Sequence, residues 1–379
     1  MRNLLSILAF LFVALLPVNL QGQQIGFDGQ VIGWTTVNPL DSLQLQGGIR
    51  YIPEVNFRIP LGKLTLEGEG SVDLWGSATY AGADTLSLDK KLKPYRVWMK
   101  LSGEQFELRA GLQKINFGSA TMIRPLMWFD QLDPRDPLQL TTGVYGLLGR
   151  YYFLNNANIW LWGLYGNNRR KGLEIYPSKE NSFEYGGRVQ LPFSLGEFAA
   201  TYHHRTSDPD AVLPEPLQIG ETAPENRYAL DAKIDFGVGA WFEGALVQKQ
   251  SDLLPIDNAT LLNAGLDYTF NLGNGLHLMF ESLWYMQGED PFSRQQEVLF
   301  GGLSLNYPIN IIHNLSAIVF VDLSNEELYR FINWSMVFDR WSFYTMAFWN
   351  PDQYLLPGFE QESNLFSGLG FQLMAVFNY

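Results

Sequence analysis

Residues 43–59 read Leu-Gln-Leu-Gln-Gly-Gly-Ile-Arg-Tyr-Ile-Pro-Glu-Val-Asn-Phe-Arg-Ile, and their side chains alternate in character. The odd positions are apolar or glycine apart from Pro53, and most of the even positions are polar or charged. A period of two places the two kinds of side chain on opposite faces of a β-strand. Pro53 removes one donor from the hydrogen-bond ladder and predicts a bulge. The stretch therefore predicts a strand with one apolar face and one polar face.

The pattern continues along the chain. Residues 63–80 alternate in the same way, and a tight turn at 60–63 joins them to the first stretch. The same reading predicts further strands throughout, and the complete set is 24–36, 42–59, 63–80, 94–102, 105–117, 143–153, 158–166, 182–192, 197–206, 226–236, 240–250, 259–270, 276–286, 296–307, 312–322, 328–338, 341–350 and 363–379.

The connections between these strands differ in length. Tight turns follow the even strands, and the longer connections follow odd ones, at 81–93, 118–142, 167–181, 207–225 and 351–362. Outward-phase aromatic residues stand beside the tight turns: Phe57, Phe153, Phe198, Phe236, Phe242, Phe270, Tyr307, Phe338 and Trp341. A β-sandwich also alternates, but it does not require an aromatic ring beside each tight turn. The sequence thus predicts an all-β fold, a transmembrane antiparallel up-and-down β-barrel of about 18 strands with both ends on the periplasmic side.

The N-terminus has the order of a secretory signal. Arg2 is followed by the apolar run 4–16, the break at Pro17 and the small residue Gly22. The run is short for a membrane-spanning helix, which needs about 20 residues, although a retained anchor is the alternative. We expect a cleaved signal peptide at 1–22, a barrel at 23–379, and an integral location in a bacterial outer membrane.

Composition excludes several classes of site. The chain has no Cys, so it forms neither disulfides nor thiolate metal sites. The formal charge of −13 argues against a nucleic-acid partner, which requires a basic face. No cofactor is expected.

Two segments resemble a known class of protein. The C-terminal segment alternates through Leu369, Phe371, Leu373 and Phe377 up to Tyr379, which resembles the C-terminal signature of outer-membrane proteins. Residues 111–118 (Gly-Leu-Gln-Lys-Ile-Asn-Phe-Gly) enter an Asp-Pro-rich loop and are similar to porin-like barrels of the alginate-export and substrate-selective type, especially those of Bacteroidetes-like bacteria. The resemblance implies a pore-forming barrel in outer-membrane lipid whose last strand is read by the barrel-assembly machinery.

The polar phase of the strands faces the interior of such a barrel, which at this size is too wide for wall side chains to fill. Two sets of charges are candidates for the pore lining. The basic wall comprises Arg50, Arg96, Arg109, Arg150, Arg188, Arg205 and Arg227, and the acidic residues are Glu67, Glu69, Asp73, Glu243, Asp267 and Glu281. A basic wall opposite an acidic one would orient polar solutes and favour anions, unless neighbouring carboxylates neutralise the arginines. Counting from the turns predicts four cross-strand pairs: Arg50 with Asp73, Lys100 with Glu107, Glu184 with Arg205, and Lys233 with Glu243.

Loop 118–142 is the longest connection and is unusually apolar for a surface loop. We expect it to fold into the barrel and to form the constriction, through Arg124, Trp128, Asp130, Asp133, Arg135 and Asp136. The three aspartates could instead bind Ca²⁺. Pairs with Arg124 and Arg135 that stiffen the loop are the favoured interpretation, so no metal site is predicted.

Catalysis is not predicted. His203 and His277 lie on the inward phase, but no Ser stands near them as a nucleophile, so we expect wall residues and not an enzyme. The leading hypothesis is a channel for passive or selective diffusion of small hydrophilic, and possibly anionic, solutes. The alternatives are a polysaccharide export or surface-attachment barrel, with Trp75, Trp98, Trp160 and Trp162 stacking on a glycan, and a non-conducting subunit of an outer-membrane complex.

Overall fold

The computed structural model describes residues 24–39, 44–81, 84–215, 218, 220–250, 257–351, 366 and 368–379. The predicted signal peptide, most of connection 351–362 and part of predicted strand 363–379 lie outside these residues. In the described part of the chain, no helix is long and apolar enough to cross a membrane.

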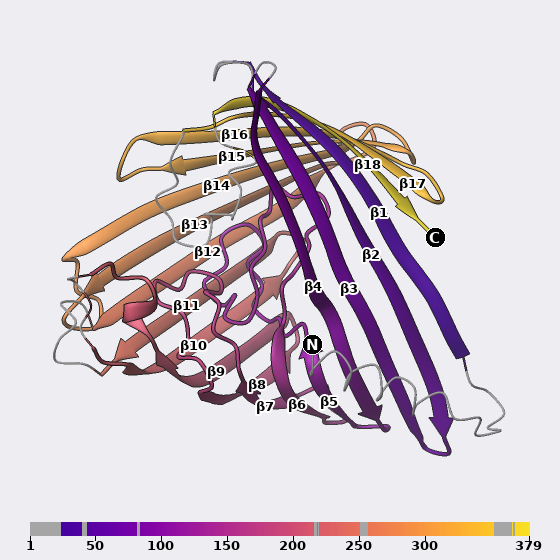
Figure 1. Cartoon of the computed structure of the whole chain (residues 1–379). Coiled ribbons are helices and arrows are strands. Elements are labelled where there is room, and N and C mark those ends of the chain that lie inside the picture. The colour runs from indigo at the N-terminus through magenta and orange to yellow at the C-terminus, as the bar shows by residue number, and fades with distance from the viewer. Residues whose placement is uncertain are drawn as a thin grey trace.

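The chain folds into one closed antiparallel sheet of 18 strands (Figure 1). Each strand pairs with its neighbours in sequence, and β1 also pairs with β18, which closes the barrel. The strands are β1 (Gln24–Asn38), β2 (Gln44–Leu61), β3 (Leu64–Ala81), β4 (Asp84–Ser102), β5 (Phe106–Gln113), β6 (Val144–Tyr152), β7 (Asn158–Tyr165), β8 (Phe183–Phe193), β9 (Gly196–Ser207), β10 (Ala223–Asp235), β11 (Gly239–Lys249), β12 (Asn258–Phe270), β13 (Leu276–Gly288), β14 (Gln296–Pro308), β15 (His313–Asp322), β16 (Glu327–Val337), β17 (Trp341–Trp349) and β18 (Leu369–Asn378). The predicted fold class and strand number are confirmed.

Alternation sets which face each residue occupies. On β9, Ala199 and His203 are about 1% exposed, whereas Phe198 between them and the tight turn is 41% exposed. The other strands repeat this division, so the outside of the barrel is an apolar surface and the inside carries most of the charges. Most of the aromatic residues predicted beside the tight turns are exposed on that outer surface, among them Phe236 and Trp341.

Two local predictions are wrong. Connection 81–93 is not a long loop, because β4 begins at Asp84 and pairs with β3 almost to its end. The dense charge of residues 89–93 hid a strand in which Leu88, Lys90 and Leu92 share the outward face while Asp89 and Lys91 point to the other face. Pro53 causes no register shift in β2; the shifts occur one hairpin further on, at Ser71/Val72 and Thr79/Tyr80.

The tight turns set the register of the hairpins. Between β2 and β3, Gly62 has a φ of +67°, a left-handed conformation that glycine adopts without steric cost. Such turns match the twist of antiparallel strands and hold Leu61 opposite Leu64.

Candidate functional site: the bore and its two inward loops

The connection between β5 and β6, residues 114–143, lies inside the barrel, and we call it the inward loop (Figure 1). The main-chain N–H groups of Ser119 and Ala120 donate to the carboxylate of Glu243 on β11. Those of Thr121, Met122 and Ile123 donate to Glu281 on β13, at 2.6, 3.0 and 2.7 Å. Between these two strands, Asn263 of β12 donates to the carbonyl oxygen of Ile123 at 2.9 Å. One wall of the barrel therefore holds the loop through its backbone.

The apolar part of the inward loop forms a core within the bore. Ile123, Leu126, Trp128 and Phe129 are each less than 5% exposed. They cluster with Phe117 and with apolar side chains that point inward from β6, β7 and β12 to β16. Burial of these side chains from water accounts for the position of a sequence too apolar for a solvated loop. The apolar core of the loop lies against β6, β7 and β10 to β16, and the end of the loop, with Leu138 and Leu140, packs on β1, β2 and β18.

The polar residues of the loop are bonded separately. Asp130 accepts the N–H of Thr142 at 2.7 Å, Asp133 pairs with Arg135 at 2.6 Å, and Asp136 accepts the N–H of Leu138 at 2.9 Å. Among the described residues, no group of three or more carboxylate or imidazole side chains could hold a metal ion. The predicted stiffening pair exists for Arg135. For Arg124 the expectation of a carboxylate partner is wrong, because its guanidinium donates to Asn116 and to the carbonyl of Phe117.

Burial raises the pKa of Asp136 to about 6 and also raises the pKa of Asp130. A carboxyl group with a raised pKa binds a proton in the folded protein at pH values where the unfolded chain has lost it, so its contribution to stability falls as the pH rises from about 4 to about 6. We expect Asp136→Asn, which keeps the oxygen that accepts the Leu138 N–H, to raise the urea unfolding midpoint at about pH 8 and to leave it unchanged at about pH 4. An equal shift at both pH values would show that ionisation of Asp136 is not the cause.

A second inward loop, residues 166–182, joins β7 to β8 and contributes to a buried ionic cluster. Glu174 of this loop accepts from Arg227 at 2.8 Å and lies 3.3 Å from Arg205. Glu225 contacts both arginines, Arg205 at 2.6 Å and Arg227 at 2.7 Å. All four side chains are at most 4% exposed. The cluster ties the second inward loop to β9 and β10, and buried charges of this kind are stable only when paired.

Next to this cluster, Glu184 of β8 lies 3.4 Å from Lys171 and 3.2 Å from Nε2 of His203. The other ring nitrogen of His203 accepts the indole N–H of Trp162 at 3.2 Å. His203 is about 1% exposed, so it is a bonded wall residue. Lys171 and Glu174 were not predicted as site residues, because they stand in a segment whose sequence indicates only a long connection.

The predicted basic wall divides into two parts. Arg188, Arg205 and Arg227 are about 3% exposed or less, and Arg188 pairs with Asp231 at 2.5 Å. Arg96, 6% exposed, bonds Thr141 and the carbonyl of Tyr95. These four arginines do not face an open bore. Basic side chains that are 16–30% exposed remain on β2 to β6, each beside a carboxylate: Arg50, Lys93, Lys100, Arg109 and Arg150.

The predicted acidic residues divide in the same way. Glu243 and Glu281 are at most 1% exposed and hold the inward loop, and Asp73 is also buried. Glu67 and Glu69 are half-buried beside Lys100 and Trp98, at 2.5 and 2.9 Å. Asp267 is about one-third exposed and lies 3.2 Å from His277.

Two of the predicted cross-strand pairs are wrong and one differs in register. Lys100 bonds Glu67, while Glu107 bonds Arg150 at 3.0 Å. Lys233 lies opposite Trp241, and Glu243 lies opposite Asp231. Arg50 does contact Asp73, at 3.1 Å, but reaches it diagonally because Trp75 is its direct partner across the ladder. If the predicted turn is wrong by two residues, each residue is paired with the next inward residue of the neighbouring strand, and every side chain stays on its correct face of the sheet.

The four predicted glycan-stacking tryptophans are not equivalent. Trp162 is 4% exposed within the core, and Trp160 lies beneath Arg150, whose guanidinium carbon is 3.7 Å from the ring centre. Trp98 is covered in the same manner by Arg109 at 4.8 Å. Trp75 stacks on Trp34 of β1, a residue that the sequence analysis did not single out, with ring centres 6.2 Å apart.

No family model and no curated protein matches this sequence. Solved structures do match its fold. OccAB4 of Acinetobacter baumannii is 9% identical, with 96% of this chain and 100% of that chain covered and a TM-score of 0.56. OccK7 (OpdD) of Pseudomonas aeruginosa is 11% identical, with 95% and 99% covered and a TM-score of 0.53. OmpT, an outer membrane protein of Vibrio cholerae, is 9% identical, with 94% and 99% covered and a TM-score of 0.53. The chain therefore shares the barrel fold of these proteins over nearly its whole length.

Proposed function

We propose that this protein is a porin-like channel of a bacterial outer membrane through which small hydrophilic solutes diffuse. The observation that carries the proposal is the uneven filling of the bore. The second inward loop and residues 119–123 of the first are bonded to β8–β13, and the end of the first loop reaches β4 through Arg96, while β2–β6 keep partly exposed charged side chains. The exposed apolar outer surface suits a lipid environment, and OmpT, a protein of the same fold, is an outer membrane protein.

In this proposal the inward loop is the constriction and solutes pass along the wall of β1 to β6. Single-channel recording in planar bilayers tests the channel itself. Discrete conductance steps from the purified barrel are the expected result, whereas silent bilayers, with the loop present or deleted, would favour a non-conducting subunit of a larger complex.

We also propose that the partly exposed basic side chains give the pore a preference for anions, because five of them share three carboxylates, Glu67, Asp73 and Glu107. Removing two of them, with Lys100→Gln and Arg109→Gln, should shift the reversal potential in a KCl gradient toward cation selectivity, because a fixed positive charge attracts the opposite ion. Lys63→Gln, in the exposed turn between β2 and β3, is the matched control and should leave the potential unchanged. Equal potentials in all three proteins would remove the basis for anion preference.

A glycan-transporting barrel is the second candidate, favoured by the stacked pair Trp34 and Trp75 on the less filled side of the bore. Aromatic faces stack on apolar faces of sugar rings. Glycan binding that is lost in Trp75→Ala and kept in Trp162→Phe would support this function over general diffusion.

We propose that the chain reaches the outer membrane through a cleaved signal peptide at 1–22 and that the barrel-assembly machinery reads β18. The strand closes the barrel against β1, and the hydroxyl of Tyr379 lies 2.8 Å from that of Tyr51 on the outer surface. Tyr379 therefore lies at one edge of the apolar surface.

A further inference from the structure

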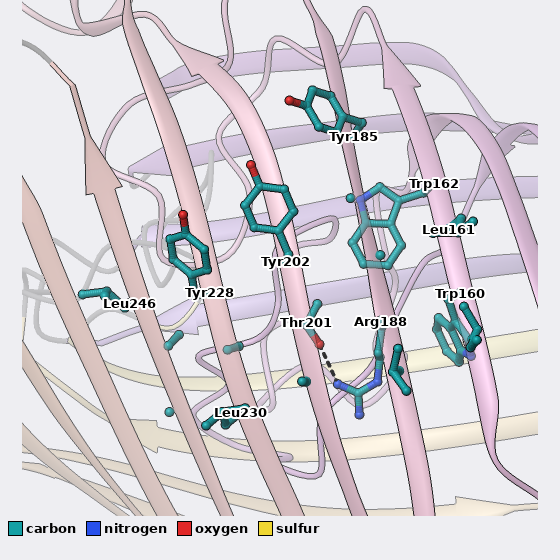
Figure 2. Close-up of a pocket in the computed structure, with 18 of the residues that line it drawn as sticks. Trp160, Leu161, Trp162, Tyr185, Arg188, Thr201, Tyr202, Tyr228, Leu230 and Leu246 are labelled. Carbon is teal, nitrogen blue, oxygen red and sulfur yellow. Dashed lines mark hydrogen bonds between the residues drawn. The ribbon is translucent and has the colours of Figure 1, made fainter.

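The outer face of the barrel is hollowed where it crosses β7 to β12. The hollow is a groove of about 1200 Å³, and Figure 2 shows residues that line it. It lies on the face that the apolar residues Leu161, Leu230 and Phe242 occupy, each more than 45% exposed. The groove is therefore separate from the bore and from the two inward loops.

Small outward residues make the floor of the groove. Ala200 of β9 stands between Val189 of β8 and Leu230 of β10, its direct partners across the two ladders. Gly244 of β11 stands in the same way between Leu230 and Leu262. A missing side chain at these positions, flanked by large neighbours, leaves a depression in the outer surface.

A row of polar side chains lies on the outer face just beyond the long-loop end of the groove, and Tyr185 belongs to both. Tyr185, His204, Asn226, Gln248 and Asn258 are successive cross-strand partners from β8 to β12. Asn226 accepts from the hydroxyl of Tyr202 at 2.8 Å and contacts His204 at 2.9 Å, and Gln248 donates to Asn258 at 3.3 Å. The hydroxyls of Tyr202 and Tyr228 point toward the end at which Tyr185 lies (Figure 2).

The side chains that line the groove are neutral apart from Arg188, and its guanidinium points inward to Asp231 at 2.5 Å. A strongly charged headgroup would thus meet no counter-charge among the residues of the groove. An apolar groove that ends in a row of hydrogen-bonding side chains matches one occupant, an acyl chain followed by its ester or amide linkage.

We propose that the groove is a specific site for an acyl chain of a membrane lipid, whose linkage bonds the row from Tyr185 to Asn258. The inference rests on the membrane location in the proposed function, but not on conduction. A bound acyl chain would cover the part of the sheet where the outward side chains are small, at Ala200 and Gly244.

The test uses the full-length barrel in nanodiscs of phosphatidylethanolamine that contain a small share of the same lipid with a photoreactive acyl chain. After illumination, mass spectrometry maps the adducts. We expect severalfold more adducts on outward residues of β8–β12 than on those of β14–β17. The variant Ala200→Trp/Gly244→Leu fills the groove and should abolish the excess.

Gly301→Leu on β14 is the matched control, because its added side chain also points outward and meets no atom within 4 Å of the new Cβ. It should leave the adduct pattern unchanged. Even labelling of all strands, or an excess that survives the filled groove, would overturn the proposal. Cross-links between two chains that the filled groove removes would assign the groove to a second copy and overturn it too. Failure of the barrel to enter nanodiscs would contradict the membrane location, an outcome distinct from even labelling.

Discussion

The double variant Glu243→Ala/Glu281→Ala should increase the single-channel conductance severalfold. These two carboxylates accept five main-chain N–H groups from residues 119–123, and each is at most 1% exposed. A hydrogen bond to a charged group contributes about 1.5–3 kcal/mol, and a buried donor left without a partner costs about 1–3 kcal/mol. Loss of both carboxylates leaves the loop held mainly by its apolar core, so we expect it to leave the bore for part of the time.

Conductance and its fluctuations measure this release. Asp267→Asn is the control within the same wall, because the carboxylate of Asp267 is about one-third exposed and lies 3.2 Å from Nε2 of His277 on the neighbouring strand. A barrel in which the double variant and a deletion of 119–128 both conduct as the unmodified protein does would show that the inward loop does not limit the flow of ions.

The largest effect on stability is expected from Arg205→Met. The arginine is about 1% exposed, donates to Glu225 at 2.6 Å, and also reaches Glu174, Ser178 and the carbonyl of Tyr176. Its removal leaves two buried carboxylates with Arg227 as their remaining close arginine, and breaking a buried pair in this way costs about 3–5 kcal/mol.

Urea unfolding in detergent, followed by tryptophan fluorescence, measures the loss. Arg58→Met is the comparison, since the Arg58 side chain is 62% exposed and an exposed ion pair contributes about 0–1 kcal/mol. Adding Glu225→Gln to Arg205→Met should restore part of the stability by removing one uncompensated charge. Equal midpoints for Arg205→Met and Arg58→Met would mean that the cluster does not stabilise the barrel.

The strands could be predicted because alternation is local. Residues 43–59 show their two faces without any knowledge of their partners, and the structure places a strand there. The start of β4 was missed because Lys90, Lys91 and Lys93 made a paired hairpin look like a solvated loop. A run of charged residues lowers the hydropathy of a segment, but a paired hairpin can carry charged side chains on both of its faces.

The contents of the bore were less predictable. Glu243 and Glu281 were assigned to the inward phase, but their partners stand more than 100 residues away in the sequence, so no spacing could link them. For Glu174 a weak signal existed: it stands between Leu173 and Ile175, apolar neighbours that are unusual for a solvated connection. Apolar residues in a connection predicted that loop 118–142 lies inside the barrel, and they would have predicted the same for this second loop.

Solutes are proposed to pass along the wall of β1 to β6 and not along that of β8 to β11. Because the chain has no Cys, one introduced cysteine is a unique reporter. The decisive measurement is the single-channel current before and after a bulky thiol reagent is added to Lys100→Cys and to Thr201→Cys. The Lys100 side chain is 20% exposed and Thr201 is 5% exposed, and both point inward. We predict a lasting fall in current for Lys100→Cys and none for Thr201→Cys. A current that is unchanged in Lys100→Cys after confirmed labelling, or that falls in Thr201→Cys alone, would contradict the account.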